Sequence, residues 1–235
     1  MRPLPMGPVV ALAVLLPAVL MPMVGCVREP APRQPDVSSS TSSTADAVTV
    51  DPGNIRRVGR EFPPGYEVTN IARADSPAAL WGLGAGAVSN PSQCMTLAAP
   101  AAGDDRSAQG VSGSGAGGIL DAVVVSSPGG SLRLDGAAVV GCPHWDLTAG
   151  RTVVAVGLTD APLIDGADTL GMVADIRAAV EAGSEIDSRA YTFVAYLGDH
   201  YVFTMLTVDP GSILPSLPPR FAADLLVETV SMLRG

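Results

Sequence analysis

The sequence predicts an α+β domain in which helices pack on a mostly antiparallel sheet and one disulfide crosslinks the fold. Residues 191–208 have the composition of two strands joined by a tight turn, and residues 54–60 and 220–233 have the spacing of amphipathic helices. Two cysteines, Cys94 and Cys142, lie far apart within the same region. These three observations together favour a single α+β domain.

The first 25 residues have the three parts of a secretion signal. Arg2 and the amino terminus supply positive charge, Val9 to Leu20 form an apolar run, and Gly25 ends a stretch of small and apolar residues. The run is interrupted by Pro17 and is shorter than the roughly 20 residues that span a bilayer. We therefore predict a signal peptide over residues 1–25, with a retained transmembrane helix as the weaker alternative.

The segment that ends at Cys26 resembles a bacterial lipobox, whose cysteine is diacylated on sulfur before the signal is removed. Gly25 and Cys26 match this motif, and Met23 stands where leucine is usual. The resemblance implies that Cys26 becomes the first residue of the mature chain and carries its lipid. Two acyl chains would anchor the protein stably on the extracytoplasmic face of the cell membrane. An ordinary secreted protein with an incidental cysteine is the alternative.

Residues 26–53 have the composition of a flexible tether. They contain several prolines, no aromatic residue, and a run of serine and threonine from Ser38 to Thr44. Such a segment cannot bury enough apolar surface to offset the entropy lost on ordering. We therefore expect one folded domain, residues 54–235, held away from the membrane by this tether.

The charge of the chain excludes one class of partner. The formal net charge is −9, with 23 acidic and 14 basic residues, and all of the basic residues are arginine. Acidic groups distributed along the chain would repel phosphate backbones, so nucleic acid is not an expected partner. The partners we expect are the membrane, through the lipid anchor, and a lipid or an envelope protein.

The two remaining cysteines predict a disulfide between Cys94 and Cys142, because exported chains normally pair such residues. On the chain-entropy account, a crosslink over this separation stabilises the fold by roughly 4 kcal/mol. The alternative is a free catalytic thiol with His144 as its base, which would need a reduced cysteine outside the cell. The spacing of cysteine and histidine indicates neither a zinc site nor any other cofactor.

The pattern of apolar residues, prolines and glycines predicts the order of elements. Helices are expected over 54–60, over parts of 77–88 and 91–98, over 165–182 with Asp165 as its N-cap, and over 220–233. Strands are expected over 66–72, 119–126, 132–140 and 152–159, followed by the hairpin of 191–208.

The glycine-rich stretch GVSGSGAGG, residues 110–118, satisfies G-x-G-x-x-G through Gly113, Gly115 and Gly118. A dinucleotide-binding motif must follow a strand and begin a helix, whereas this stretch follows a polar segment and leads into a strand-like one. It contains no G-x-S-x-G nucleophile motif either. We interpret it as a flexible loop, which could move over a pocket.

The strongest local signal is YTFVAYLGDHYVFTMLTV, two β-rich runs joined by Gly198 and Asp199. If Leu197 lies opposite His200, both faces of the hairpin are apolar, although a hairpin with one face in water alternates apolar with polar residues. The hairpin is therefore either covered on both sides or lends one face to a ligand. In the second case the tentative ligand-binding residues are Trp81, Tyr196, Tyr201, Phe203 and Met205.

Catalysis has little support in the sequence, so we expect a protein that is not an enzyme. His144 and His200 are the only histidines. His200 stands beside the hairpin turn, and in a strand Asp199 would point to the opposite side from it. No sequence motif nominates a nucleophile or a carboxylate pair, although a cell-wall hydrolase remains the less favoured hypothesis.

Several segments together resemble mycobacterial lipoproteins of an uncharacterised family: the lipobox at Cys26, the Ser/Thr tether, ALWGLGAGAVSNPSQC, the glycine-rich stretch and FVAYLGDHYVFT with FAADLLVETV. In architecture and cysteine use, the chain is more distantly similar to the extracellular sensor domain of PknH-type kinases. The resemblance implies an envelope-facing domain with a ligand cleft. Two hypotheses follow, a domain that binds a lipid or glycolipid in a cleft and a protein-interaction or sensor-like module.

Overall fold

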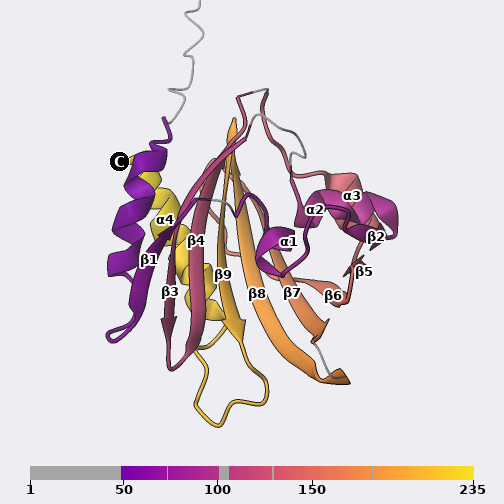
Figure 1. Cartoon of the computed structure of the whole chain (residues 1–235). Coiled ribbons are helices and arrows are strands. Elements are labelled where there is room, and N and C mark those ends of the chain that lie inside the picture. Colours follow the sequence, from indigo (N-terminus) through magenta and orange to yellow (C-terminus); the bar gives the residue numbers. More distant parts are fainter. Residues whose placement is uncertain (1–48, 73, 101–105, 129, 181–182) are drawn as a thin grey trace, which may run out of the picture. The chain divides into compact units, whose positions relative to one another are not determined.

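In the part of the chain that the structure describes, nine strands form one antiparallel sheet in the order β1-β3-β4-β9-β8-β7-β6-β5-β2 (Figure 1). Every neighbouring pair is antiparallel, and β8 pairs with β7 on one side and with β9 on the other. The strands are β1 (Glu67–Ile71), β2 (Val88–Asn90), β3 (Ser107–Gly115), β4 (Gly118–Ser126), β5 (His144–Ala149), β6 (Thr152–Thr159), β7 (Asp168–Ala179), β8 (Glu185–Leu197) and β9 (His200–Val208).

The computed structural model describes residues 49–72, 74–100, 106–128, 130–180 and 183–235. The predicted signal peptide, Cys26 and nearly all of the predicted tether lie outside these residues. The described residues form one compact unit. Within the described residues, no helix combines the length and the apolarity that crossing a membrane requires.

Helical segments cover both faces of the sheet and give three layers (Figure 1). The 3-10 helix η1 and helix α4 pack on the face of β3, β4, β8 and β9. The short helices α1, η2, α2 and α3 lie over the other face. Their bounds are η1 (Pro52–Arg60), α1 (Pro77–Leu80), η2 (Ser92–Cys94), α2 (Met95–Ala98), α3 (Gly136–Gly141) and α4 (Arg220–Arg234).

The α+β class with a mostly antiparallel sheet is confirmed. The two terminal helical segments follow their apolar spacing. In η1 the buried residues are Ile55 and Val58, three apart as a 3-10 turn requires, and in α4 the buried stripe includes Leu226, Val230 and Leu233. The predicted strands at 66–72, 119–126 and 152–159 and the hairpin are present, with small differences in their ends.

The predicted helix over 165–182 is wrong, because this segment forms strand β7. Residues two apart, Leu170, Met172, Ala174 and Ile176, are buried, which is the period of a strand. The same segment also contains apolar residues with the spacing of one face of a helix. The outcome is decided by β6 and β8, which pair with β7 on either side and satisfy its backbone groups.

The glycine-rich stretch is also not the expected loop, since most of it forms strand β3. Its glycines make room for the aromatic rings of the segment after η1. A Cβ atom at Gly113 would lie 2.3 Å from Phe62 Cδ2, and one at Gly115 would lie 2.4 Å from Tyr66 Cδ2. Glycine therefore serves close packing at these positions instead of mobility.

The predicted strand over 132–140 needs correction as well, whereas the short helices expected within 77–88 and 91–98 are present. Residues 136–141 form α3, because the Asp135 side chain caps its start by accepting hydrogen bonds from the backbone N–H groups of Ala137 and Ala138. The segment 77–88 holds only the one-turn α1, and its last residue, Val88, begins β2. The segment 91–98 does contain helical turns, η2 and α2.

The predicted disulfide between Cys94 and Cys142 is present, with a Cα–Cα distance of 5.7 Å. Both cysteines are fully buried. Cys94 ends η2 and Cys142 directly follows α3, so the bridge fixes these two covering segments to each other. The free catalytic thiol that was the alternative is therefore not formed.

Candidate functional site

The aromatic hairpin is covered on both faces. Leu197 lies opposite His200, as predicted, and both apolar faces of β8 and β9 are buried. One face belongs to the core under α4 and η1, and the other to the core under α1, α2 and α3. Of the two alternatives that the sequence left open, the structure therefore has the buried hairpin.

The five tentative ligand-binding residues all lie in this second core. Trp81, Tyr196, Tyr201, Phe203 and Met205 are each at most 5% exposed. None of them lines either of the two hollows described below. Their role in binding a ligand stays a prediction, while their role in packing is evident.

Specific contacts hold these aromatic side chains in place. Trp81 Nε1 donates a hydrogen bond of 3.3 Å to Thr192 Oγ1, and the ring centroids of Tyr201 and Phe203 are 6.1 Å apart in a stacked arrangement. The Tyr201 hydroxyl donates to the backbone carbonyl of Asp75. Burial is the main cause that raises the pKa of Tyr201 well above its ordinary value, so this phenol stays protonated and acts as a donor.

The two histidines are far apart in the sheet, at the start of β5 and the start of β9. His200 Nδ1 lies 2.6 Å from Asp199 Oδ1. The expectation that Asp199 points away from His200 is therefore wrong, because Asp199 lies in the turn and not in a strand. His144 is exposed. It lines a hollow of about 450 Å³ formed by residues of β2, β5, β6 and β7, together with Asn90 and Asp146.

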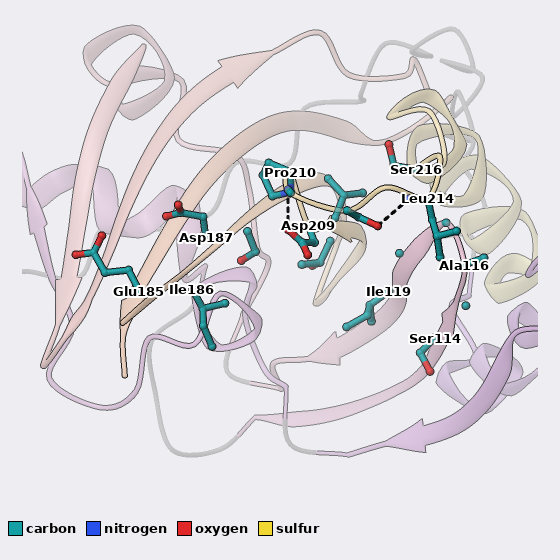
Figure 2. Close-up of a pocket in the computed structure, with 18 residues that line it drawn as sticks. Ser114, Ala116, Ile119, Glu185, Ile186, Asp187, Asp209, Pro210, Leu214 and Ser216 are labelled. Atoms are coloured by element: carbon teal, nitrogen blue, oxygen red, sulfur yellow. Dashed lines mark hydrogen bonds between the residues drawn. The ribbon is translucent and has the colours of Figure 1, made fainter. Parts of the chain in front are cut away.

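A groove of about 840 Å³ lies at the place where β9 ends. Figure 2 shows Glu185, Ile186 and Asp187 on one side of this groove and Ser114 and Ile119 on the other. The β9–α4 loop forms the third wall. The lining residues are 114–119 from the β3–β4 turn, 185–188 from β8, and 207–212, 214 and 216 from the end of β9 and the loop.

The groove combines apolar side chains with carboxylates. Its exposed apolar side chains include Ile119, Ile186 and Leu214, which are 45%, 57% and 53% exposed. Isolated exposed apolar residues are normal, but three that line one groove indicate a surface suited to a partner. The charged side chains of the lining are Glu185, Asp187 and Asp209, and no basic residue is among the lining residues.

The carboxylates of the groove are exposed and only partly engaged. Asp209 Oδ1 accepts a hydrogen bond of 2.7 Å from the backbone N–H of Gly211 and so shapes the turn that leads out of β9. Asp187 Oδ1 lies 3.9 Å from Arg177 Nε, and both of these side chains are largely exposed. Exposed carboxylates create a negative potential over the groove, which favours a positively charged group of a partner.

The backbone of β8 extends beyond β9 at this groove. Strand β8 pairs with β7 down to Glu185, which lies opposite Ala179. Its pairing with β9 ends at Arg189, opposite Val208, after which the chain turns away at Asp209. Within the described residues, 185–188 of β8 therefore have a neighbouring strand on one side only, and their second edge faces the groove.

A buried carboxyl lies next to the groove on the same face of the sheet. Asp121 of β4 has Ser112 and Met205 as cross-strand neighbours, two residue pairs inward from Ser114, Ile119 and Thr207 of the lining. Burial raises the pKa of Asp121 to about 6, and its hydrogen bond with the Ser112 side chain opposes this shift.

The groove is not evident from the sequence. Its residues belong to three segments that are distant in sequence, and only the first of them, 114–119, overlaps a pattern noted in the sequence, the glycine-rich stretch. The available signals are the alternation in Glu185-Ile186-Asp187-Ser188 and the D-P-G turn at 209–211. Neither signal shows that β9 is shorter than β8, because strand register is a property of the assembled sheet.

The chain belongs to the family described as a domain of unknown function, DUF5642, whose model matches residues 51–234. An uncharacterised Mycobacterium smegmatis protein, the Rv0999 ortholog, has a similar solved structure, with a TM-score of 0.58 and 18% identity over 79% of this chain and 98% of that one. The extracellular domain of PknH from Mycobacterium tuberculosis matches with a TM-score of 0.45 and 11% identity over 80% of this chain and 93% of that one. No curated protein matches significantly. The resemblance to an uncharacterised family with a mycobacterial relative is thereby confirmed.

Proposed function

We propose that this protein is a lipid-anchored, extracytoplasmic interaction module without catalytic activity, and that it binds its partner in the groove at the end of β9. The observation that carries this proposal is the groove itself, with its three exposed apolar side chains beside three carboxylates. Exposed carboxylates suit the attraction of a positively charged group of a partner.

An amphipathic lipid or glycolipid is the second candidate for the occupant. The apolar side of the groove, with Ile119, Ile186 and Leu214, favours it. The carboxylates oppose an anionic headgroup, so only a neutral or cationic amphiphile would suit this site. The aromatic hairpin gives this candidate no support, because its side chains are packed in the core.

The test uses the mature chain, labelled with ¹⁵N and carrying Cys26→Ser so that it can be studied without detergent. The probes are a pentapeptide of alternating valine and arginine (VRVRV, with blocked ends) and monomeric dodecyl maltoside, a neutral amphiphile with a sugar headgroup. We expect at least one probe to shift backbone amide signals of residues 114–119, 185–188 and 207–216. If neither probe shifts these signals, the proposal is wrong.

A matched pair of variants controls the assignment to the groove. Ile186→Asp should abolish the shifts, because it places a charge on the apolar side of the groove. Val153→Asp introduces the same charge at a residue of β6 that is similarly exposed, 48%, and does not line the groove, so the shifts should persist. Equal losses in both variants would contradict binding in the groove.

The lipid anchor at Cys26 is a separate part of the proposal. It is supported by the match of Gly25 and Cys26 to the lipobox and by the Cys94–Cys142 disulfide, which suits an oxidising compartment. In a mycobacterial host, an alkyne-tagged palmitate should label the full chain, and Cys26→Ser should lose both the label and the membrane fractionation. A labelled Cys26→Ser protein would exclude lipidation at this cysteine.

A further inference from the structure

We infer that the groove binds an extended peptide segment with alternating apolar and basic side chains, which adds to the sheet as a strand along the overhanging edge of β8. This inference rests on the proposed function and names the chemistry of the partner. It is based on the strand register at the end of β9 and on the side chains that alternate along residues 185–188 of β8.

The backbone argument begins with the unequal lengths of β8 and β9. Residues 185–188 continue β8 past the last residue of β9 that pairs with it, Val208. An edge strand presents backbone N–H and C=O groups that can pair with another chain. The β9–α4 loop and the β3–β4 turn border the same space, so a segment bound there would occupy the place that β9 leaves.

The side chains of residues 185–188 of β8 determine which side-chain pattern the partner peptide needs. Ser188 lies opposite Ile176, a residue of the core under α1, α2 and α3, so Ile186 and Ser188 face this side of the sheet. Glu185 and Asp187 face the other side, because successive residues of a strand alternate. Residues directly opposite in a pair share a face, so an apolar residue would contact Ile186 and a basic residue would meet Glu185 or Asp187.

Charge and exposure agree with this pattern. Ile119 contributes a second exposed apolar side chain across the groove, on the same face of the sheet as Ile186. The lining offers three carboxylates and no basic residue, and Arg177, whose Nε lies 3.9 Å from Asp187 Oδ1, is itself largely exposed, so a basic partner residue can replace it there. A lipid would use the apolar side chains but would leave the open backbone edge unpaired, which is why we favour a peptide over a lipid.

The direct test compares binding of VRVRV with that of two N-methylated forms, methylated at odd or at even residues. Alternate amides of a strand point to opposite edges, so each form blocks one edge of the peptide. We expect one form to lose at least tenfold in affinity and the other to bind nearly as well. Hydrogen exchange of the amides in 185–188 should slow when VRVRV is bound.

Charge is tested with protein and peptide variants together. The double variant Glu185→Gln, Asp187→Asn should weaken VRVRV binding about fivefold, because two exposed carboxylates are lost. The matched control Asp146→Asn lies on β5, away from the groove, and should not change the affinity. The peptide VEVEV should bind at least tenfold more weakly than VRVRV.

The outcomes separate this inference from the proposed function. If VRVRV shifts the groove signals but both methylated forms bind equally, the groove binds a partner and strand addition is wrong. If only dodecyl maltoside binds, the partner is an amphiphile and the peptide inference is overturned. If no probe shifts the groove, the proposed function itself fails.

Discussion

Strand β8 has two ends with opposite environments. Residues 192–197 are buried on both faces, whereas 185–187 are exposed and one edge of this part faces the groove. The buried end is covered by helical layers and paired on both edges; the exposed end lies beyond β9. The comparison teaches that one continuous strand can serve the core at one end and offer a binding edge at the other.

The largest expected difference between the two ends is in stability. Phe203→Ala, in β9 directly opposite Val194 of the buried end of β8, removes a fully buried ring that stacks on Tyr201 and should lower the free energy of unfolding by about 3–5 kcal/mol. Ile186→Ala at the exposed end should change it by less than about 0.5 kcal/mol. Chemical denaturation of both variants measures this contrast, and similar losses would contradict it.

Asp121 of β4, which lies opposite Met205 of the buried part of β9, should make the stability of the protein depend on pH. Because its folded pKa is about 6 and its ordinary value is 3.8, the folded state holds the proton more tightly. Stability linked to this group is therefore full below about pH 4 and falls as pH rises through 6, by up to about 3 kcal/mol.

The variant Asp121→Asn isolates this contribution. Its free energy of unfolding should exceed that of the unmodified chain at pH 7, and the difference should disappear towards pH 4. Both proteins are chemically denatured at a series of pH values. The contributions of the other carboxylates cancel in the difference between the two free energies of unfolding. A difference that is constant over this range would show that burial does not raise the pKa of Asp121.

A glycine on the covered face tests the close packing of β3. Gly113→Ala should lower the free energy of unfolding by about 1–3 kcal/mol, because its Cβ would lie 2.3 Å from the Phe62 ring. Gly84→Ala is the matched control, since a Cβ there meets nothing within 4 Å, and its effect should stay within about 0.5 kcal/mol. Equal stabilities for the two variants would contradict the close packing of Gly113 and would favour the flexible loop expected from the sequence.

The smallest expected effect concerns one buried hydrogen bond. Thr192→Val keeps the shape of the side chain but leaves the Trp81 indole N–H without its acceptor, which should cost about 1 kcal/mol. Thr148→Val, at an exposed residue of β5, should be neutral within about 0.5 kcal/mol. The midpoints of thermal unfolding of the two variants measure this difference. If Thr192→Val unfolds at the same midpoint as the unchanged chain, the Trp81–Thr192 hydrogen bond does not contribute to stability.

The sequence predicted the elements whose signals are local. Gly198 has a positive φ of 71° in the turn that joins β8 and β9, and Leu197 lies opposite His200 because a two-residue turn fixes the register. The final helix follows its own apolar stripe. The segment 168–179 shows where prediction from local signals fails, because its apolar residues fit both a helix and a strand. Pairing with β6 and β8 selects the strand.

By itself, the sequence determined the α+β class, the hairpin with two apolar faces, the terminal helix and the Cys94–Cys142 pair. Only the tertiary structure decided that helices cover both hairpin faces, that the glycines of β3 accommodate aromatic rings, and that β9 stops four residues short of the start of β8. The physical reason is the range of the interactions. Periodicity and turn geometry act between neighbours along the chain, whereas covering a face or leaving an edge open depends on segments that meet only after folding.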